Sequence, residues 1–340
     1  MKEYLGLLGE SDGRVILYSN GHSTNSQYID DRFNQAAHDF REDPNLRGRL
    51  LQIMPEDSFD RTRTVLLNTL EPGDIVVVGG GDGTISSIAK TILAHPDKEV
   101  RKTPFLALPG GNANLGSSDL LDRHGEMLSV KQLLSGGEIR ESRPMRLEIY
   151  SPLLEKPTLE LAMFISGIGA SAMTELEFEK RRHNPLRKFK ASRLAVDGLS
   201  AAIGLMRQNR SPIDFSINGL QVESGAGVIT ANTSRYAKGF RVPTSLDEEG
   251  FKSIILPKAK LADEIKIASK ALLNRYDWYP THSGETLELA VQIGANQKVG
   301  LDTDGEPQIL PYDRSEEVYT RILQSVHNEG VNMVVYRKPV

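Results

Sequence analysis

The clearest pattern in the chain is a run of apolar residues at positions 75–78, followed by glycines and then by apolar side chains at helical spacing. Four consecutive β-branched residues favour a parallel strand that is buried on both faces. Ile85, Ile88, Ala89 and Ile92 recur at i, i+3, i+4 and i+7, which predicts an amphipathic helix with Thr84 as its N-cap. The glycines therefore lie where a strand passes into a helix N-terminus, a place where backbone N–H groups can bind phosphate.

The same alternation of strands and helices fills the N-terminal part of the chain. The patterns predict strands at 15–18, 49–54 and 103–109 and helices at 29–40 and 58–70. Such alternation implies a parallel sheet with right-handed crossovers. We therefore predict a doubly wound α/β domain.

From about position 145 the pattern changes to a period of two. Apolar and polar residues alternate at 145–150, 214–217, 220–222 and 286–291, and Asn218-Gly219 is a strong hairpin signal. Further short strands are predicted at 161–165, 227–231 and 253–256. These strands indicate a mostly antiparallel β-sandwich. The last part of the chain predicts a helix at 315–328 and a strand at 331–336.

Composition restricts the classes of function. The chain has 340 residues and a net charge of −4, which argues against a nucleic-acid binder. It has no cysteine, which excludes disulfides and thiol catalysis and fits a reducing compartment. The N-terminus does not read as a signal peptide, and the longest uncharged stretch, 161–173, is shorter than the roughly 20 residues of a membrane helix. We expect a cytoplasmic protein that is at most peripheral to the membrane.

One segment departs from this acidic average. Residues 180–193 contain seven Lys or Arg side chains. Anionic membrane surfaces attract basic segments, so peripheral membrane contact is one interpretation. A solvated helix face is the alternative.

The glycine-rich segment reads Gly80-Gly81-Asp82-Gly83-Thr84. It completes neither G-x-G-x-x-G nor a Walker A motif. A carboxylate beside phosphates is explained if Mg²⁺ bridges Asp82 to them. A tight structural turn is the alternative.

Two further polar loops follow predicted strands. The first contains Asn20, and the second contains Gly111, Asn112 and Asn114. Ligands of open α/β sheets bind at the carboxyl edge of the strands, so we expect both loops to lie near the glycine-rich segment.

Together these residues carry a resemblance. Residues 80–84 resemble the GGDGT signature, and residues 109–114 resemble the P-x-G-T-x-N-D element, of the diacylglycerol-kinase-like lipid kinases, which are related to sphingosine and ceramide kinases and more distantly to NAD kinases. The resemblance implies a nucleotide-binding α/β domain at 1–143, joined by the tail 311–340, and a β-sandwich substrate domain at 144–310. It also implies ATP and Mg²⁺, with Asp82 as a catalytic residue and metal ligand, and with Asn20, Gly80, Gly81, Gly83, Thr84, Gly111, Asn112 and Asn114 at the nucleotide.

The resemblance extends to the second domain. Asp304-Gly305-Glu306 looks like the family's D-G-E element, which makes Glu306 the base that activates the acceptor hydroxyl; a hairpin turn with solvated acids is the alternative. Residues 164–170 are similar to the family's G-x-G segment, where two glycines permit close backbone approach or form a bulge. Glu249 stands where the family has an aspartate near a structural Mg²⁺.

One position departs from the family. Leu115 replaces the aspartate that ends the second element.

We expect an ATP- and Mg²⁺-dependent lipid kinase that binds its lipid between the two domains. Two alternatives remain, a nucleotide-binding pseudokinase, motivated by Leu115, and a kinase of a soluble polyol or nucleotide, motivated by the wide occurrence of GGDGT. A homodimer is also considered.

Overall fold

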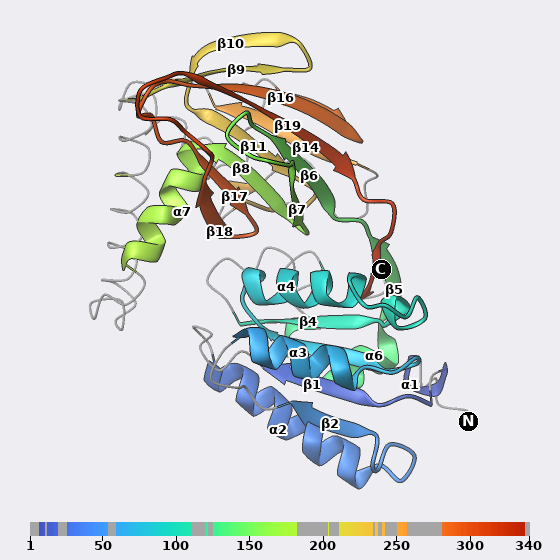
Figure 1. Ribbon diagram of the computed structural model, residues 1–340. Helices are drawn as coiled ribbons and strands as arrows, with labels where there is room; N and C mark the ends of the chain where they lie inside the picture. Colours follow the sequence, from blue (N-terminus) through green and yellow to red (C-terminus); the bar gives the residue numbers. More distant parts are fainter. Residues whose placement is uncertain are drawn as a thin grey trace. The chain divides into compact units, whose positions relative to one another are not determined.

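The computed structural model describes residues 7–10, 12–19, 26–53, 59–110, 120–121, 125–181, 203, 211–233, 235–236, 240–241, 250–256 and 281–336. The chain divides into two compact units (Figure 1). The first unit consists of Met1–Pro144 and Asn328–Val340, and the second of Met145–His327. The predicted fold class is confirmed, because the first unit is α/β with a mainly parallel sheet and the second is antiparallel β.

The first unit is built on a six-stranded sheet with the order β2-β1-β3-β4-β20-β5. Strands β2, β1, β3, β4 and β20 are parallel and β5 is antiparallel. Helix α2 packs with α6, and α3 packs with α4. The elements are α1 (Leu7–Glu10), β1 (Val15–Ser19), α2 (Ser26–Glu42), β2 (Leu50–Ile53), α3 (Phe59–Thr69), β3 (Ile75–Gly80), α4 (Asp82–Leu93), η1 (Val100–Lys102), β4 (Phe105–Pro109), η2 (Gly125–Met127), α6 (Val130–Gly136), β5 (Glu138–Ser142) and β20 (Val331–Val335).

The strand order places a topological switch point beside β1. The chain leaves β1 for β2 on one side and returns to β3 on the other, and in open α/β sheets the carboxyl ends of the strands beside such a switch point, here β1 and β3, are the usual place for a ligand. Register brings Ser19 of β1 beside Gly79, and Gly80 beside Pro109 of β4. The predicted glycine-rich segment thus lies at this edge of the sheet.

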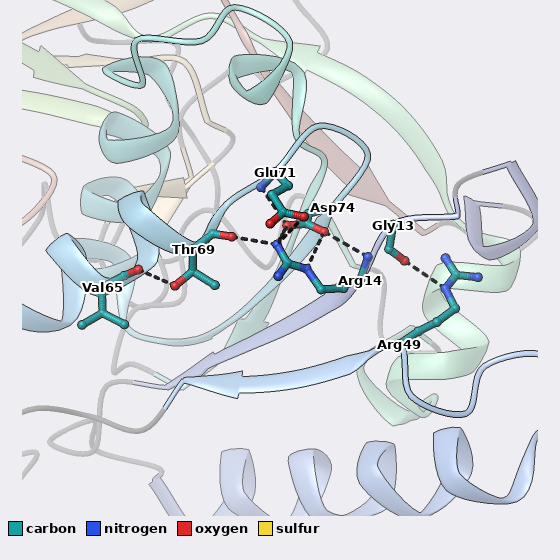
Figure 2. Close-up of polar contacts among 7 residues, drawn as sticks. All are labelled: Gly13, Arg14, Arg49, Val65, Thr69, Glu71 and Asp74. Atoms are coloured by element: carbon teal, nitrogen blue, oxygen red, sulfur yellow. Dashed lines mark hydrogen bonds and ion pairs between the residues drawn. The ribbon is translucent and has the colours of Figure 1, made fainter.

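An ion pair lies at the other ends of these strands, the amino-terminal ends of β1 and β3 (Figure 2). Asp74, which is 1% exposed, accepts hydrogen bonds from the backbone N–H of Arg14 at 3.0 Å and from Arg14 Nη2 at 2.7 Å. The same Nη2 donates to the carbonyl of Thr69 at 2.7 Å. The hydrogen bond to Asp74 raises the pKa of the Arg14 guanidinium. These contacts join the start of β1 to the turn that leads into β3.

The second unit is a sandwich of two six-stranded antiparallel sheets. One sheet has the order β10-β9-β16-β19-β6-β7 and the other the order β15-β14-β11-β8-β17-β18. Helix α7 packs against β8, β11, β17 and β18. The elements are β6 (Met145–Tyr150), β7 (Thr158–Ala162), β8 (Ile165–Gly169), α7 (Ala170–Arg181), β9 (Ile213–Ile217), β10 (Leu220–Gly225), β11 (Gly227–Ala231), β12 (Arg235–Tyr236), β13 (Phe240–Arg241), β14 (Phe251–Leu256), β15 (Thr281–Gly284), β16 (Thr286–Ile293), β17 (Gly300–Thr303), β18 (Glu306–Ile309) and β19 (Val318–Val326).

Alternating apolar residues from both sheets form the core of the sandwich. Leu147 and Ile149 of β6 and Leu289 and Val291 of β16 belong to one buried hydrophobic cluster. The predicted Asn218-Gly219 hairpin is confirmed, because both residues have positive φ, 47° and 82°. Among the helices of the described residues, none combines the length and apolar character needed to cross a membrane.

Three sequence predictions about this part of the chain are wrong. The predicted helix at 315–328 is strand β19, whose inward residues alternate with exposed ones and which pairs with β16 and β6. Since β19 belongs to the sandwich, the segment that returns to the first unit begins at 328 rather than 311. The predicted strand at 161–165 is the end of β7, two connecting residues and the start of β8.

Candidate functional site

The glycine-rich segment forms the junction of β3 and α4. Gly81 is the N-cap, with extended backbone angles of −84° and 177°, and the helix begins at Asp82. The prediction of Thr84 as the N-cap is wrong, because Thr84 lies inside the first turn with 7% of its surface exposed. Its side chain occupies the space that Gly80 leaves, since a Cβ on Gly80 would lie 2.7 Å from Thr84 Cβ.

Glycines also bring the ends of two strands into contact. The N–H of Gly110, which follows β4, donates to the carbonyl of Gly80 at 2.8 Å. A Cβ on Gly110 would lie 3.0 Å from the backbone of Gly80, and a Cβ on Gly79 would lie 2.2 Å from Ile29 Cγ2 on α2. The loops after β3 and β4 therefore start side by side, as their positions after neighbouring strands predict.

Asp82 is the acidic residue of this junction. It occupies the first turn of α4 and is partly exposed, as are Gly81 and Gly83. The positive end of the helix dipole stabilises a carboxylate at this position. Within the described residues, no group of three or more acidic or histidine side chains is arranged to hold a metal. A single carboxylate fits Mg²⁺, which commonly takes one or two carboxylates and completes its shell with substrate phosphates and water.

Several predicted site residues lie outside the part of the chain that the structure describes. They are Asn20, Gly111, Asn112, Asn114, Leu115, Glu249 and residues 182–193 of the basic segment. Their roles stay predictions.

The Asp304-Gly305-Glu306 element is a two-residue hairpin turn between β17 and β18. Asp304 and Gly305 have positive φ, 58° and 84°, and Glu306 begins β18 with an exposed side chain. Asp304 is 1% exposed, so the interpretation of both acids as solvated is wrong for this residue. Its carboxylate accepts hydrogen bonds from the N–H groups of Met163, Phe164 and Ile165 at 2.6, 2.7 and 2.9 Å. Asp304 therefore holds the start of β8 against the hairpin that carries Glu306.

Asp302 is a buried acid that the sequence analysis missed. It is 2% exposed, and its Oδ1 has no hydrogen-bond partner among the residues that the structure describes. Burial, and then the charges of Glu175 and Asp304, raise the pKa of Asp302 well above its ordinary value. The available signal was an acidic residue in a short strand otherwise composed of Gly, Leu and Thr.

The two glycines of the 164–170 segment face α7 and a neighbouring strand. A Cβ on Gly167 would lie 2.1 Å from Ser171 Oγ, and Gly169 has a φ of +79° with the carbonyl of Ala226 close by. Close backbone approach is thus used for packing within the second unit.

Comparison with known proteins finds a family match over part of the chain. Residues 16–146 match the diacylglycerol kinase catalytic domain. A structure from Bacillus anthracis str. Sterne, described provisionally as a diacylglycerol kinase, is 12% identical with a TM-score of 0.61, covering 96% of this chain and 98% of that chain. Yeast NADH kinase in complex with NADH is 15% identical with a TM-score of 0.50, covering 96% of this chain and 84% of that chain. These structural similarities show a shared fold.

The search of curated proteins found no match. The family match nevertheless covers β1, β3, α4 and β4, which are the elements that carry the glycine-rich segment. It confirms the resemblance seen in the motifs. Residues 16–146 thus match the diacylglycerol kinase catalytic domain, and the similarity to the two solved structures extends the shared fold over nearly the whole chain.

Proposed function

We propose that the chain is an ATP- and Mg²⁺-dependent lipid kinase that transfers the γ-phosphoryl group to a lipid hydroxyl. The observation that carries this proposal is the placement of Asp82 at the N-terminus of α4, at the switch point of the sheet. The family match at residues 16–146 supports the reaction class.

The residues of the first unit would position the nucleotide. The backbone at Gly80, Gly81 and Gly83 would receive the phosphates, because N–H groups at a helix N-terminus attract anions. Thr84, packed on Gly80, would complete the cradle. Bound Mg²⁺ would neutralise charge on the phosphates, and Asp82 would hold it. Asn20, Gly111, Asn112 and Asn114 would line the remainder of the nucleotide site, and Glu249 would ligate a separate structural Mg²⁺.

The acceptor step would involve Glu306, which is exposed at the start of β18. The lipid hydroxyl oxygen forms a bond to the γ-phosphorus while the bond to the bridging oxygen of ADP breaks. Glu306 accepts the hydroxyl proton and later releases it to water.

The experiment is phosphoryl transfer from labelled ATP, with Mg²⁺, to a total lipid extract. Label should enter the organic phase, and Asp82→Asn should reduce the rate by about a hundredfold or more, because catalysis of phosphoryl transfer is mostly positioning and charge stabilisation. Asp97→Asn is the matched control, since Asp97 is an exposed acid in the turn after α4. Full transfer by the Asp82 variant would contradict the site assignment.

Leu115 motivates a second candidate, a nucleotide-binding pseudokinase. The same experiment separates the two, because nucleotide binding without transfer would support the pseudokinase. Label that stays in the aqueous phase on a new product would support a soluble polyol or nucleotide as acceptor.

We also propose peripheral membrane contact through residues 180–193. Sedimentation with anionic and with neutral vesicles tests this proposal. Equal binding to both kinds of vesicle would contradict membrane contact.

A homodimer is a separate proposal. Light scattering of the free protein would show whether it forms one.

A further inference from the structure

Two buried acids lie at the turn that carries Glu306. Asp304 is part of this turn, and its carboxylate accepts three N–H groups at the start of β8. Asp302 lies two positions earlier on β17, in register with Pro307 of β18. The next pair of the ladder is Thr303 with Glu306, which closes the hairpin. Asp302 is therefore one residue pair away from the position of Glu306.

Helix α7 covers Asp302. Gly167 is the residue beside Asp302 on β8, and a Cβ on it would lie 3.9 Å from Asp302 Cβ and would clash with Ser171 Oγ of α7. The Asp302 side chain therefore lies on the side of the sheet where α7 packs against β8, β17 and β18 (Figure 1). Since Asp302 is only 2% exposed, it is too buried to contact a substrate. Any part that it takes in the reaction must act through its neighbours.

The turn is one of these neighbours. The N–H of Gly305, the residue before Glu306, donates a hydrogen bond to the Asp302 carboxyl. Since Oδ1 has no hydrogen-bond partner among the described residues, the acceptor is Oδ2. Burial, and then the charges of Glu175 on α7, Asp304 in the turn and Glu306 on β18, raise the pKa of this carboxyl well above its ordinary value. The carboxyl is therefore uncharged at a pH where an exposed carboxylate such as Glu306 is ionised.

We propose that Asp302 is a positioning residue for Glu306: as an uncharged acid it accepts the N–H of Gly305 and so fixes the turn, without adding a negative charge beside Glu306. The inference rests on the proposed function, in which Glu306 accepts the proton of the lipid hydroxyl. A general base works only within hydrogen-bond reach of this proton, so a turn that shifts by about 1 Å would lower the rate strongly. An ionised Asp302 would repel Asp304 and Glu306, which would also displace the turn.

The test compares phosphoryl transfer by Asp302→Asn and Asp302→Ala in the full-length protein, with labelled ATP and the lipid extract. Asparagine keeps the shape and an uncharged acceptor, so Asp302→Asn should keep the wild-type rate at saturating ATP within about twofold at pH 7. Asp302→Ala leaves the N–H of Gly305 without its acceptor, so this rate should fall about tenfold. The KM for ATP should change in neither variant, because the proposed phosphate cradle belongs to the first unit.

Asp313→Ala is the matched control. Asp313 is another acid of the second unit that accepts a backbone N–H, here from Ser315 at 2.7 Å, and it lies between β18 and β19. The substitution removes the same atoms from a different turn. This variant should keep the wild-type rate.

The pH profile of the rate separates positioning from a purely structural role. In the wild type the rate should fall at alkaline pH as Asp302 ionises, and Asp302→Asn should lack this fall. Glu175→Gln removes a charge that opposes the ionisation of Asp302, so the fall should move to lower pH. A contact that only stabilises the sandwich would give all three proteins the same profile.

Hydrogen exchange of the Gly305 amide is a readout that does not depend on activity. This amide should exchange about tenfold faster in Asp302→Ala than in the wild type and Asp302→Asn. If the wild type transfers no phosphoryl group, the proposed function fails, and exchange at Gly305 alone decides whether Asp302 fixes the turn. Equal exchange in all three proteins, a full transfer rate in Asp302→Ala, or a pH profile shared by the wild type and Asp302→Asn would each overturn the inference. The comparison of the wild type with Asp302→Asn holds even where Asp302→Ala does not fold.

Discussion

Replacing Asp304 by Asn should destabilise the second unit strongly while leaving its shape nearly unchanged. The Asp304 carboxylate binds three consecutive N–H groups, of which Phe164 and Ile165 share Oδ1 and Met163 contacts Oδ2. An asparagine can still accept the hydrogen bonds from Phe164 and Ile165 with its side-chain oxygen. Its amide nitrogen would then face the N–H of Met163, so two donors would meet in a buried position.

The magnitude follows from these contacts. A hydrogen bond to a charged acceptor contributes about 1.5–3 kcal/mol, and a buried donor left without a partner costs about 1–3 kcal/mol. Asp304→Asn should therefore lower the free energy of unfolding by about 3–5 kcal/mol, the range observed when one partner of a buried charged contact is removed. Such a loss is a large part of the roughly 5–15 kcal/mol that stabilises a typical domain.

Urea unfolding measures the free energy, and hydrogen exchange of residues 163–165 localises the change to the start of β8. Asp302→Asn is the matched control, because Asp302 is equally buried two residues away but makes no hydrogen bond through Oδ1 with the described residues, so this variant should not lower the free energy of unfolding. A loss below about 1 kcal/mol for Asp304→Asn, with the three amides still protected, would refute the assignment of Asp304 as the anchor of β8.

Two further predictions concern charge. The pKa of Asp302 is raised by burial and by Glu175 and Asp304, so the folded protein holds this proton more tightly than the unfolded chain. The stabilising contribution of this proton is fully present below the unfolded pKa of about 4 and is lost as the pH rises through the folded pKa. In urea titrations, Asp302→Asn should therefore match the wild type near pH 4 and be more stable than the wild type at pH 7–8. Equal stability of variant and wild type at both pH values would contradict the raised pKa of Asp302. Asp74→Asn should lower the free energy of unfolding by about 2–3 kcal/mol, because it weakens the ion pair with Arg14 at 2.7 Å. Lys102→Met is the control, since it removes an exposed ion pair with Glu99. It should change the free energy of unfolding by less than about 1 kcal/mol in the same urea assay.

The first unit could be predicted in detail because its signals are local. Runs of β-branched residues at 75–78 and the helical spacing from Ile85 to Ile92 specify β3 and α4 without knowledge of their neighbours. The rule that ligands bind at the carboxyl edge of such a sheet then places Asp82. What failed here was the cap, because Thr84 packs on Gly80 instead of capping the helix.

The second unit was less predictable because its contacts are distant in sequence. Val318 and Ile322 have the i, i+4 spacing of a helix, yet the segment pairs as β19 with β16 and β6, of which β6 begins more than 170 positions earlier. Tertiary pairing of this kind overrides local spacing. The burial of Asp304 depends on the same distant pairings, so no local pattern reveals it.

The contact between the ends of β3 and β4 gives a prediction that separates binding from stability. Gly110→Ala would place a Cβ 3.0 Å from backbone atoms of Gly80, which cannot rotate away. The two turns must then move apart by a few tenths of an ångström, and overpacking of this kind costs about 1–3 kcal/mol of stability. Since Gly80 forms part of the proposed phosphate cradle, affinity for ATP should fall about tenfold, a loss that isothermal calorimetry can measure.

Gly136→Ala is the control for this change. Its Cβ would also lie 3.0 Å from a neighbour, but that neighbour is the ring edge of Tyr336, a side chain that can rotate. Alanine is also favoured over glycine at the end of α6. This variant should bind ATP as the wild type does. If Gly110→Ala lost stability but kept full affinity for ATP, the contact with Gly80 would only hold the sheet together, and the nucleotide would have to bind away from the β3–β4 edge.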